Sequence, residues 1–212
     1  MYALISSQKI QLPPGTVVRM LGSWEDYRAL QDSRGDASIP RIKYRVEEVL
    51  LMSPLPKHGR DAHLVAGIVT ALLDAQNRNY EAFTPITMEL PEQGGIEPDY
   101  CFYIDNWQGV VGRDRLNWGI DPWPDLAIEI DVTNYTDVND YLLYRLPEVW
   151  LCRRSRLAIY RLQDNEYRLQ ETSPYFPGID LSALFEQCVR AAGERGTGAA
   201  TRELRRQIAA RT

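Results

Sequence analysis

The sequence LAIEIDV, residues 126–132, is the most informative segment of the chain. Aliphatic residues alternate in it with small or acidic ones, and successive side chains of a strand point to opposite faces of its sheet. The pattern therefore predicts a strand with one apolar face and one face that carries Glu129 and Asp131. We expect the apolar face to pack on the protein core.

The segments on either side of this strand predict a sheet covered by helices. Residues 61–77 have apolar side chains at helical spacing, and residues 80–89, 97–104 and 148–152 have the composition of strands. Residues 105–124 resemble a loop. Further expected elements are short helices at 23–30 and 137–145, a helix at 181–192, a strand at 48–52, and a hairpin of residues 157–161 and 167–172. This order favours an α/β (α+β) fold with a mixed β-sheet flanked by helices.

The chain has 212 residues and is 44% hydrophobic, which is enough for one sizeable domain. We place that domain at residues 39–192. Residues 1–38 form an N-terminal extension with a short helix, and residues 193–212 form a basic, helical C-terminal tail.

The charge and the composition of the chain limit the classes of function that we expect for it. The net charge of −5 requires any nucleic-acid surface to be local rather than global. No apolar run approaches the roughly 20 residues that cross a bilayer, so we expect a cytoplasmic protein without a membrane partner. The three widely spaced cysteines are expected to be reduced and buried. The sequence contains no phosphate-binding glycine loop, nucleophile elbow or zinc-binding cluster.

Two acidic residues are candidates for metal chemistry. Asp99 opens the strand at 97–104, so it would meet Glu129 if the two strands are neighbours. Two adjacent carboxylates repel each other unless a cation lies between them, and hard oxygen ligands suit Mg²⁺ or Mn²⁺. The alternative is that Glu129 and Asp131 line the solvated face of a half-exposed strand while Asp99 belongs to a turn after Pro98.

Several motifs, taken in their order along the chain, resemble those of a known family. They are IPRIKY at 39–44, MSPLP at 52–56 followed by His58, EPD at 97–99, CFYI at 101–104, PDLAIEIDVT at 124–133 and PEVW at 147–150. Together they resemble the Uma-two-type putative restriction endonucleases of the PD-(D/E)XK superfamily, over roughly residues 24–185. The resemblance implies a restriction-endonuclease-like α-β-β-β-α-β core and metal-dependent hydrolysis of DNA.

The same resemblance assigns roles to individual residues. Asp99 and Glu129 would be the carboxylate ligands of Mg²⁺ or Mn²⁺, and the backbone carbonyl of Ile130 would be a third ligand. His58 would hold a water or the scissile phosphate, or else pack the loop structurally. Asp131 is a neighbour in the catalytic site. The substrate would be double-stranded DNA, and a homodimer would suit cleavage of both strands.

One feature departs from the family. Such nucleases carry a lysine two residues after the glutamate or on the next helix, where it orients water or stabilises the phosphate. Position 131 is aspartate, and residues 137–145 contain no lysine. Lys57 and Arg145 are the candidates to replace it, and Asp131→Lys is predicted to restore the usual spacing and increase cleavage.

Three functions follow from these observations. The leading one is a Mg²⁺-dependent endonuclease. The second is a catalytically degenerate protein of nuclease fold that acts as a DNA-binding or protein-interaction module, which the absent lysine favours. The third is a homodimeric interaction protein without a nucleic-acid role, for which the net charge and surface positions of Trp107, Trp118 and Trp123 would be the evidence.

Overall fold

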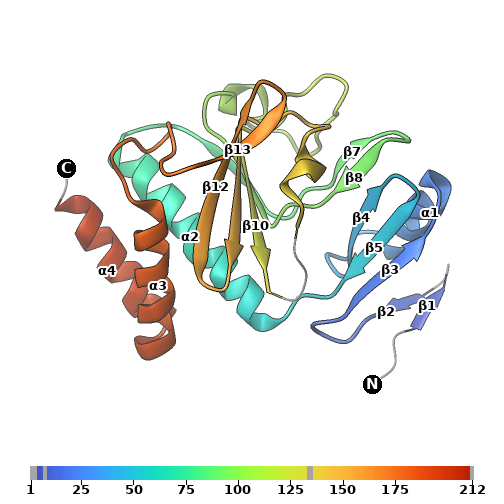
Figure 1. The fold of residues 1–212 in the computed structure, drawn as a ribbon, viewed down its shortest axis with the longest axis horizontal. Coiled ribbons are helices and arrows are strands. Elements are labelled where there is room, and N and C mark those ends of the chain that lie inside the picture. Colours follow the sequence, from blue (N-terminus) through green and yellow to red (C-terminus); the bar gives the residue numbers. More distant parts are fainter. Residues whose placement is uncertain (1–3, 7–8, 133–135, 211–212) are drawn as a thin grey trace.

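The computed structural model describes residues 4–6, 9–132 and 136–210. Two β-sheets lie side by side in it, one flanked by the helices α2, α3 and α4 and the other by α1 (Figure 1). A two-stranded ribbon, β1 (Leu4–Ser6) with β2 (Lys9–Gln11), lies near the N-terminus. The single expected sheet is therefore divided into two.

The larger sheet has six strands in the order β13-β12-β11-β10-β9-β6. Its strands are β6 (Glu81–Phe83), β9 (Tyr100–Tyr103), β10 (Leu126–Asp131), β11 (Glu148–Arg153), β12 (Arg156–Gln163) and β13 (Glu166–Gln170). β10 pairs parallel with β11 and antiparallel with β9, so the sheet is mixed. β10 lies in its interior and is buried along its whole length.

The smaller sheet has five strands in the order β3-β5-β4-β8-β7. These strands are β3 (Val17–Leu21), β4 (Arg41–Arg45), β5 (Glu48–Met52), β7 (Met88–Leu90) and β8 (Gly94–Ile96). All of its pairings are antiparallel. The chain passes from this sheet to the larger one directly after β8, through Glu97, Pro98 and Asp99.

Helices α2 (Pro56–Ala75) and α3 (Leu181–Arg195) cover one face of the six-stranded sheet, and α4 (Thr197–Ala209) packs on these two helices. They enclose the largest apolar cluster, to which β10 contributes Leu126, Ile128 and Ile130. On the opposite face, Ala127 packs in a second cluster with Tyr141 and Tyr144. Both faces of β10 are therefore covered. The predicted alternation of side chains is confirmed, but the acidic face is buried rather than exposed to solvent.

Helix α1 (Trp24–Arg34) packs on the five-stranded sheet. The Ser23 hydroxyl accepts from the Asp26 backbone N–H, and the Asp26 carboxylate accepts from the Ser23 backbone N–H, which is the capping box that the sequence predicted. Tyr27 and Leu30 pack in a third cluster with residues of β4 and β5. Tyr27 leaves no room for a side chain at Gly95 of β8, where a Cβ atom would lie 2.4 Å from its hydroxyl.

Several predicted elements are confirmed, among them β5, β10, β11, the β12–β13 hairpin and the helices α2 and α3. The single strand expected at 80–89 is wrong, because the chain leaves the larger sheet after β6 and joins the smaller one at β7, with Pro85 between them. The helix expected at 137–145 is reduced to a 3-10 turn, η2 (Val138–Tyr141). β3, β4 and β8 were not predicted as separate strands.

Two further expectations concern helices and cysteines. Among the described helices, none is long and apolar enough to cross a membrane. Cys101, Cys152 and Cys188 are buried and free, as expected. The segment 105–124 contains one short 3-10 turn, η1 (Trp107–Gly109), and is otherwise irregular.

Candidate active site

The candidate site lies where the two sheets meet. Asp99 directly precedes β9, and β9 pairs with β10 so that Tyr100 lies opposite Ile128. Asp99 lies just outside this pairing: its backbone N–H donates to the carbonyl of Ile128 at 3.0 Å, and its charge acts on the neighbouring Glu129. Asp99 and Glu129 are therefore neighbours at the junction of the two sheets, and their sharing of one divalent ion stays a prediction.

Asp99 is buried and makes contacts on several sides. Its Oδ2 accepts a hydrogen bond of 2.6 Å from the backbone N–H of Ile130. Its Oδ1 forms an ion pair with Arg41 of β4, yet no described residue donates a hydrogen bond of good geometry to that oxygen. Asp99 is thus held in place on one oxygen while the other lacks a well-aligned donor.

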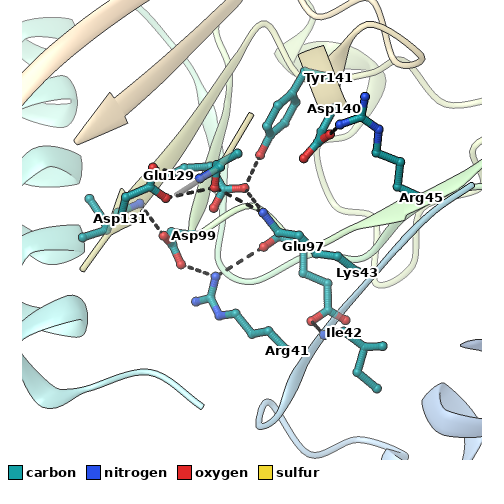
Figure 2. A network of polar contacts seen from close by, with 12 residues as sticks. Arg41, Ile42, Lys43, Arg45, Glu97, Asp99, Glu129, Asp131, Asp140 and Tyr141 are labelled. Carbon is teal, nitrogen blue, oxygen red and sulfur yellow. Dashed lines mark hydrogen bonds and ion pairs between the residues drawn. The ribbon is translucent and has the colours of Figure 1, made fainter. Parts of the chain in front are cut away.

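Glu129 is also buried, and two groups donate to its Oε1: Lys43 Nζ at 2.6 Å and the Tyr141 hydroxyl at 2.8 Å (Figure 2). Burial raises the pKa of Glu129, the Lys43 ammonium lowers it, and the charge of Asp99 raises it; the balance is a raised pKa. Burial alone would lower the pKa of Lys43, but the Glu129 carboxylate outweighs that effect and raises it. The two residues form a buried ion pair.

Asp131 is committed to structural contacts. Its carboxylate accepts from the Thr136 hydroxyl at 2.9 Å, from the Thr136 backbone at 3.0 Å and from Arg153 Nε at 2.6 Å. These contacts tie the end of β10 to the chain that follows residues 133–135. Asp131 therefore lies close enough to raise the pKa of Glu129, while its oxygens accept from Thr136 and Arg153.

His58 joins the site from the first turn of α2, and not from a loop as the sequence indicated. Its Nε2 lies 3.1 Å from Asp99 Oδ2, without the alignment of a hydrogen bond. Ile130 contacts Asp99 through its backbone N–H. The expected role of the Ile130 carbonyl as a metal ligand stays a prediction. His63 lies on the exposed side of α2, away from the site.

Lys43 and Arg41 were not predicted from the sequence as residues of the site. Ile42 and Tyr44 point from β4 into the cluster under α1, so the alternation directs Arg41, Lys43 and Arg45 to the other face. Arg41 and Lys43 reach Asp99 and Glu129 from there (Figure 2). The basic-apolar alternation of residues 41–45 is the signal that could have identified them.

The two residues proposed to replace the family lysine lie elsewhere. Lys57 is half-exposed and pairs with Asp61 one turn further along α2. Arg145 is exposed and donates to Asn165 at 2.8 Å. The printed contacts of both are thus with residues other than Asp99 and Glu129, and the ammonium that contacts Glu129 comes from β4.

A cavity of about 300 Å³ opens beside Lys43. Its lining includes three cationic side chains, three acidic side chains and two uncharged ones: Arg19, Lys43 and Arg45; Glu48, Asp137 and Asp140; Leu50 and Thr136. Glu48 pairs with Arg19 and Asp140 pairs with Arg45. Lys43 is the buried member of this lining that also contacts Glu129.

Glu97, two residues before Asp99, has a supporting role. Its carboxylate contacts Arg34 at 2.6 Å and accepts from Gln31 at 3.2 Å, both on α1, and from the Ile42 backbone on β4 at 3.1 Å. It thereby connects α1 and β4 to the segment that positions Asp99.

Comparisons with known proteins bear on the family and the fold of the chain. The mixed α/β architecture is a nuclease-like fold: the crystal structure of a putative nuclease belonging to DUF820 from Anabaena variabilis ATCC 29413 is similar, with a TM-score of 0.51. The two sequences are 17% identical, and the match covers 69% of this chain and 89% of that chain. A comparison with curated proteins gives no match. The chain belongs to the Uma2 family, described as putative restriction endonucleases, whose model matches residues 24–192.

Proposed function

We propose that this protein is a metal-dependent endonuclease that hydrolyses phosphodiester bonds of double-stranded DNA. The observation that carries the proposal is the buried pair of Asp99 and Glu129, which come from neighbouring strands and lie close to cationic side chains. Burying like charges together is unfavourable and is retained mainly where they have a function. Membership of the Uma2 family supports the same reaction class.

The donor chemistry of this pair fits a divalent ion such as Mg²⁺ or Mn²⁺. Asp99 Oδ1 is buried and lacks a well-aligned hydrogen bond among the described residues. An ionised carboxylate offers about four acceptor positions, so Glu129 can accept from Lys43 and Tyr141 and still have a position for an ion. The described residues contain no group of three or more acidic, histidine or cysteine ligands, so backbone and water oxygens would complete the coordination.

When bound, such an ion would lower the pKa of a water and neutralise charge on the phosphate. The protein's own residues would do the rest. Arg41 balances the charge of Asp99 and Lys43 that of Glu129, which reduces the repulsion of the DNA backbone. The N–H of Ile130 fixes the Asp99 carboxylate, and His58 lies where it could hold a water or a phosphate oxygen. A homodimer would present two such sites to the two strands.

A plasmid-nicking assay tests the proposal. Supercoiled DNA is incubated with the wild type in Mg²⁺, in Mn²⁺ and in EDTA, and conversion to nicked and linear forms is measured. We expect metal-dependent cutting that Asp99→Asn and Glu129→Gln abolish. Asp164→Asn, on an exposed hairpin turn, is the matched control and should cut like the wild type. Absence of cutting in both metals would refute the proposal.

One observation favours a second function, that of a degenerate nuclease fold used as a DNA-binding or protein-interaction module. Each of the three acidic residues already has a basic partner: Asp99 has Arg41, Glu129 has Lys43, and Asp131 has Arg153. In that case the ion pairs would serve stability alone. Salt-sensitive DNA binding without cutting would favour this function, because phosphate contacts release counterions.

The third function, an interaction protein that uses surface tryptophans, has less support. Trp118 and Trp123 stack on each other at 4.5 Å and pack against the second apolar cluster, and Trp107 is partly buried. These side chains stabilise the irregular segment 105–124 rather than form an exposed aromatic patch.

A further inference from the structure

Lys43 occupies a position between Glu129 and a cavity that opens beside it. Its side chain is 11% exposed, and its Nζ lies 2.6 Å from Glu129 Oε1. The same residue lines the cavity of about 300 Å³. Lys43 therefore connects the buried carboxylate with a space that a ligand can enter.

The fold places the ammonium there through the pairing of the smaller sheet. Leu50 of β5 lies opposite both Lys43 of β4 and Arg19 of β3, so these three side chains share one face. That face is directed toward β10 of the other sheet, 86 positions further along the chain at Glu129. The packing of the two sheets thus brings a buried ammonium into contact with Glu129.

The hydrogen bonding of Lys43 leaves capacity for a ligand. An ammonium group has three N–H donors. Among the described residues its partners are Glu129 and the Thr136 hydroxyl, and the Thr136 contact is long at 3.5 Å. A side chain present only to neutralise Glu129 would have no need to border a cavity, whereas one that contacts substrate must do so.

The charged groups around the cavity distinguish Lys43 from its neighbours. Arg19 pairs with Glu48, and Arg45 pairs with Asp140 and lies 3.7 Å from Asp137. The side chains of both arginines are more than half exposed to solvent, so burial does not fix them in place. Lys43 is held by burial, and a fixed charge stabilises a transition state better than a mobile one.

We propose that Lys43 is a catalytic residue that contacts the scissile phosphate from β4 and takes the place of the family's lysine. The inference rests on the proposed nuclease function. In the reaction, a water oxygen forms a bond to phosphorus while the bond from phosphorus to the bridging oxygen breaks. The attacking water loses a proton to solvent, and the departing oxygen takes one from solvent. Lys43 keeps its proton throughout and donates a hydrogen bond to a non-bridging phosphate oxygen as negative charge develops there.

The test compares Lys43→Met, which retains the length of the side chain but not its charge, with Lys57→Met as the matched control. Plasmid nicking in Mn²⁺ and the shift of the thermal midpoint by Mn²⁺ are measured on both. We expect Lys43→Met to cut about 100-fold more slowly, the usual effect of losing one such donor, while it retains the metal-induced shift. Lys57→Met should cut like the wild type. In Lys43→Ala, added ethylammonium should partly restore cutting.

The outcomes separate this inference from the function on which it rests. If the wild type does not cut, the nuclease function fails and the role of Lys43 fails with it. If the wild type cuts and Lys43→Met cuts equally well, only the role of Lys43 is overturned. Faster cutting by Lys43→Met with tighter Mn²⁺ binding would also overturn it, since Lys43 would then be a counterion that competes with the metal. If Lys43→Met does not fold, Lys43→Gln decides, because its neutral amide can still donate to Glu129.

Discussion

Arg34 of α1 lies 2.6 Å from Glu97, the residue that begins the short segment leading to Asp99. Both side chains are buried, and Gln31 and Thr87 also donate to the Glu97 carboxylate. α1 is therefore more than a cover for the smaller sheet. It fixes the point at which the chain crosses to the larger sheet, and with it the position of the candidate site.

Replacing Glu97 by alanine should destabilise the protein strongly. Removing one partner of a buried ion pair leaves the other charge unpaired and typically costs about 3–5 kcal/mol. For a domain of this size we expect the thermal midpoint to fall by roughly 10 °C, measured by circular dichroism. Glu166→Ala is the control, because Glu166 is largely exposed and 3.8 Å from Arg168. Equal effects of the two substitutions would contradict the role of Glu97.

Binding of Mn²⁺ or Mg²⁺ should raise the thermal midpoint of the wild type. A ligand that binds only the folded state at 100 times its Kd adds about 2.7 kcal/mol. Asp99→Ala should lose this response, because it removes the buried oxygen that lacks an aligned donor. Differential scanning fluorimetry with and without metal measures both proteins. The same shift in wild type and Asp99→Ala would place the ion at another site.

The contrast between Asp99 and Lys43 explains how much of the site the sequence could predict. Glu129 lies on β10 and Asp99 directly precedes the adjacent strand β9, so local motifs and the pairing of these two strands bring them near each other. Lys43 reaches Glu129 only because a second sheet packs beside the first. Sequence patterns describe each strand but not the packing of two sheets, so Lys57 and Arg145 were the predicted replacements and Lys43 of β4 was not.

The same limit applies to the fold. The β12–β13 hairpin was predictable because aspartate and asparagine tolerate the positive φ angles of a tight turn. Asp164 and Asn165 adopt such angles in the structure. The strand pattern of residues 80–89 is equally clear, but it does not say that β6 and β7 join different sheets. Tertiary pairing, which no local pattern specifies, decides such cases.

The structure reverses the expected effect of Asp131→Lys. From the sequence this change restores a Glu-x-Lys spacing, but Asp131 accepts hydrogen bonds from Thr136 and pairs with Arg153. A lysine would lose these contacts and add a positive charge beside Arg153. We expect a lower thermal midpoint and no gain in DNA cutting. Asp131→Asn, which retains one acceptor oxygen, should lose less stability. Increased cutting by Asp131→Lys at unchanged stability would show that position 131 faces the substrate.

Gly95 should be sensitive to the smallest substitution. A Cβ atom there would lie 2.4 Å from the Tyr27 hydroxyl oxygen and 2.5 Å from its ring carbon, so α1 would have to move away from β8. We expect Gly95→Ala to cost about 1–3 kcal/mol in the free energy of unfolding, measured with urea. Gly67→Ala is the control, since it lies inside α2 with no atom within 4 Å of the added methyl group. That change should stabilise the helix by about 0.5–1 kcal/mol. Equal destabilisation by both changes would mean that Tyr27 is not packed closely on Gly95.

Glu148 gives the stability of the protein a specific pH dependence. It is fully buried at the start of β11, where burial raises its pKa, while hydrogen bonds from Ser173 and Trp150 lower it in part. Because the pKa is higher in the folded than in the unfolded state, the folded protein binds this proton more tightly. The resulting stabilisation is fully present below the unfolded value, about 4.3, and is lost as the pH rises through the folded value.

Glu148→Gln removes this titration and retains an oxygen that can accept from Trp150, whose Nε1 lies 2.5 Å from Glu148 Oε1. We therefore expect the thermal midpoint of the variant, relative to the wild type, to increase between pH 4 and pH 7. Glu166→Gln, at an exposed position, is the control and should follow the wild type across this range. A constant difference between Glu148→Gln and wild type at all pH values would mean that Glu148 titrates alike in the folded and unfolded states.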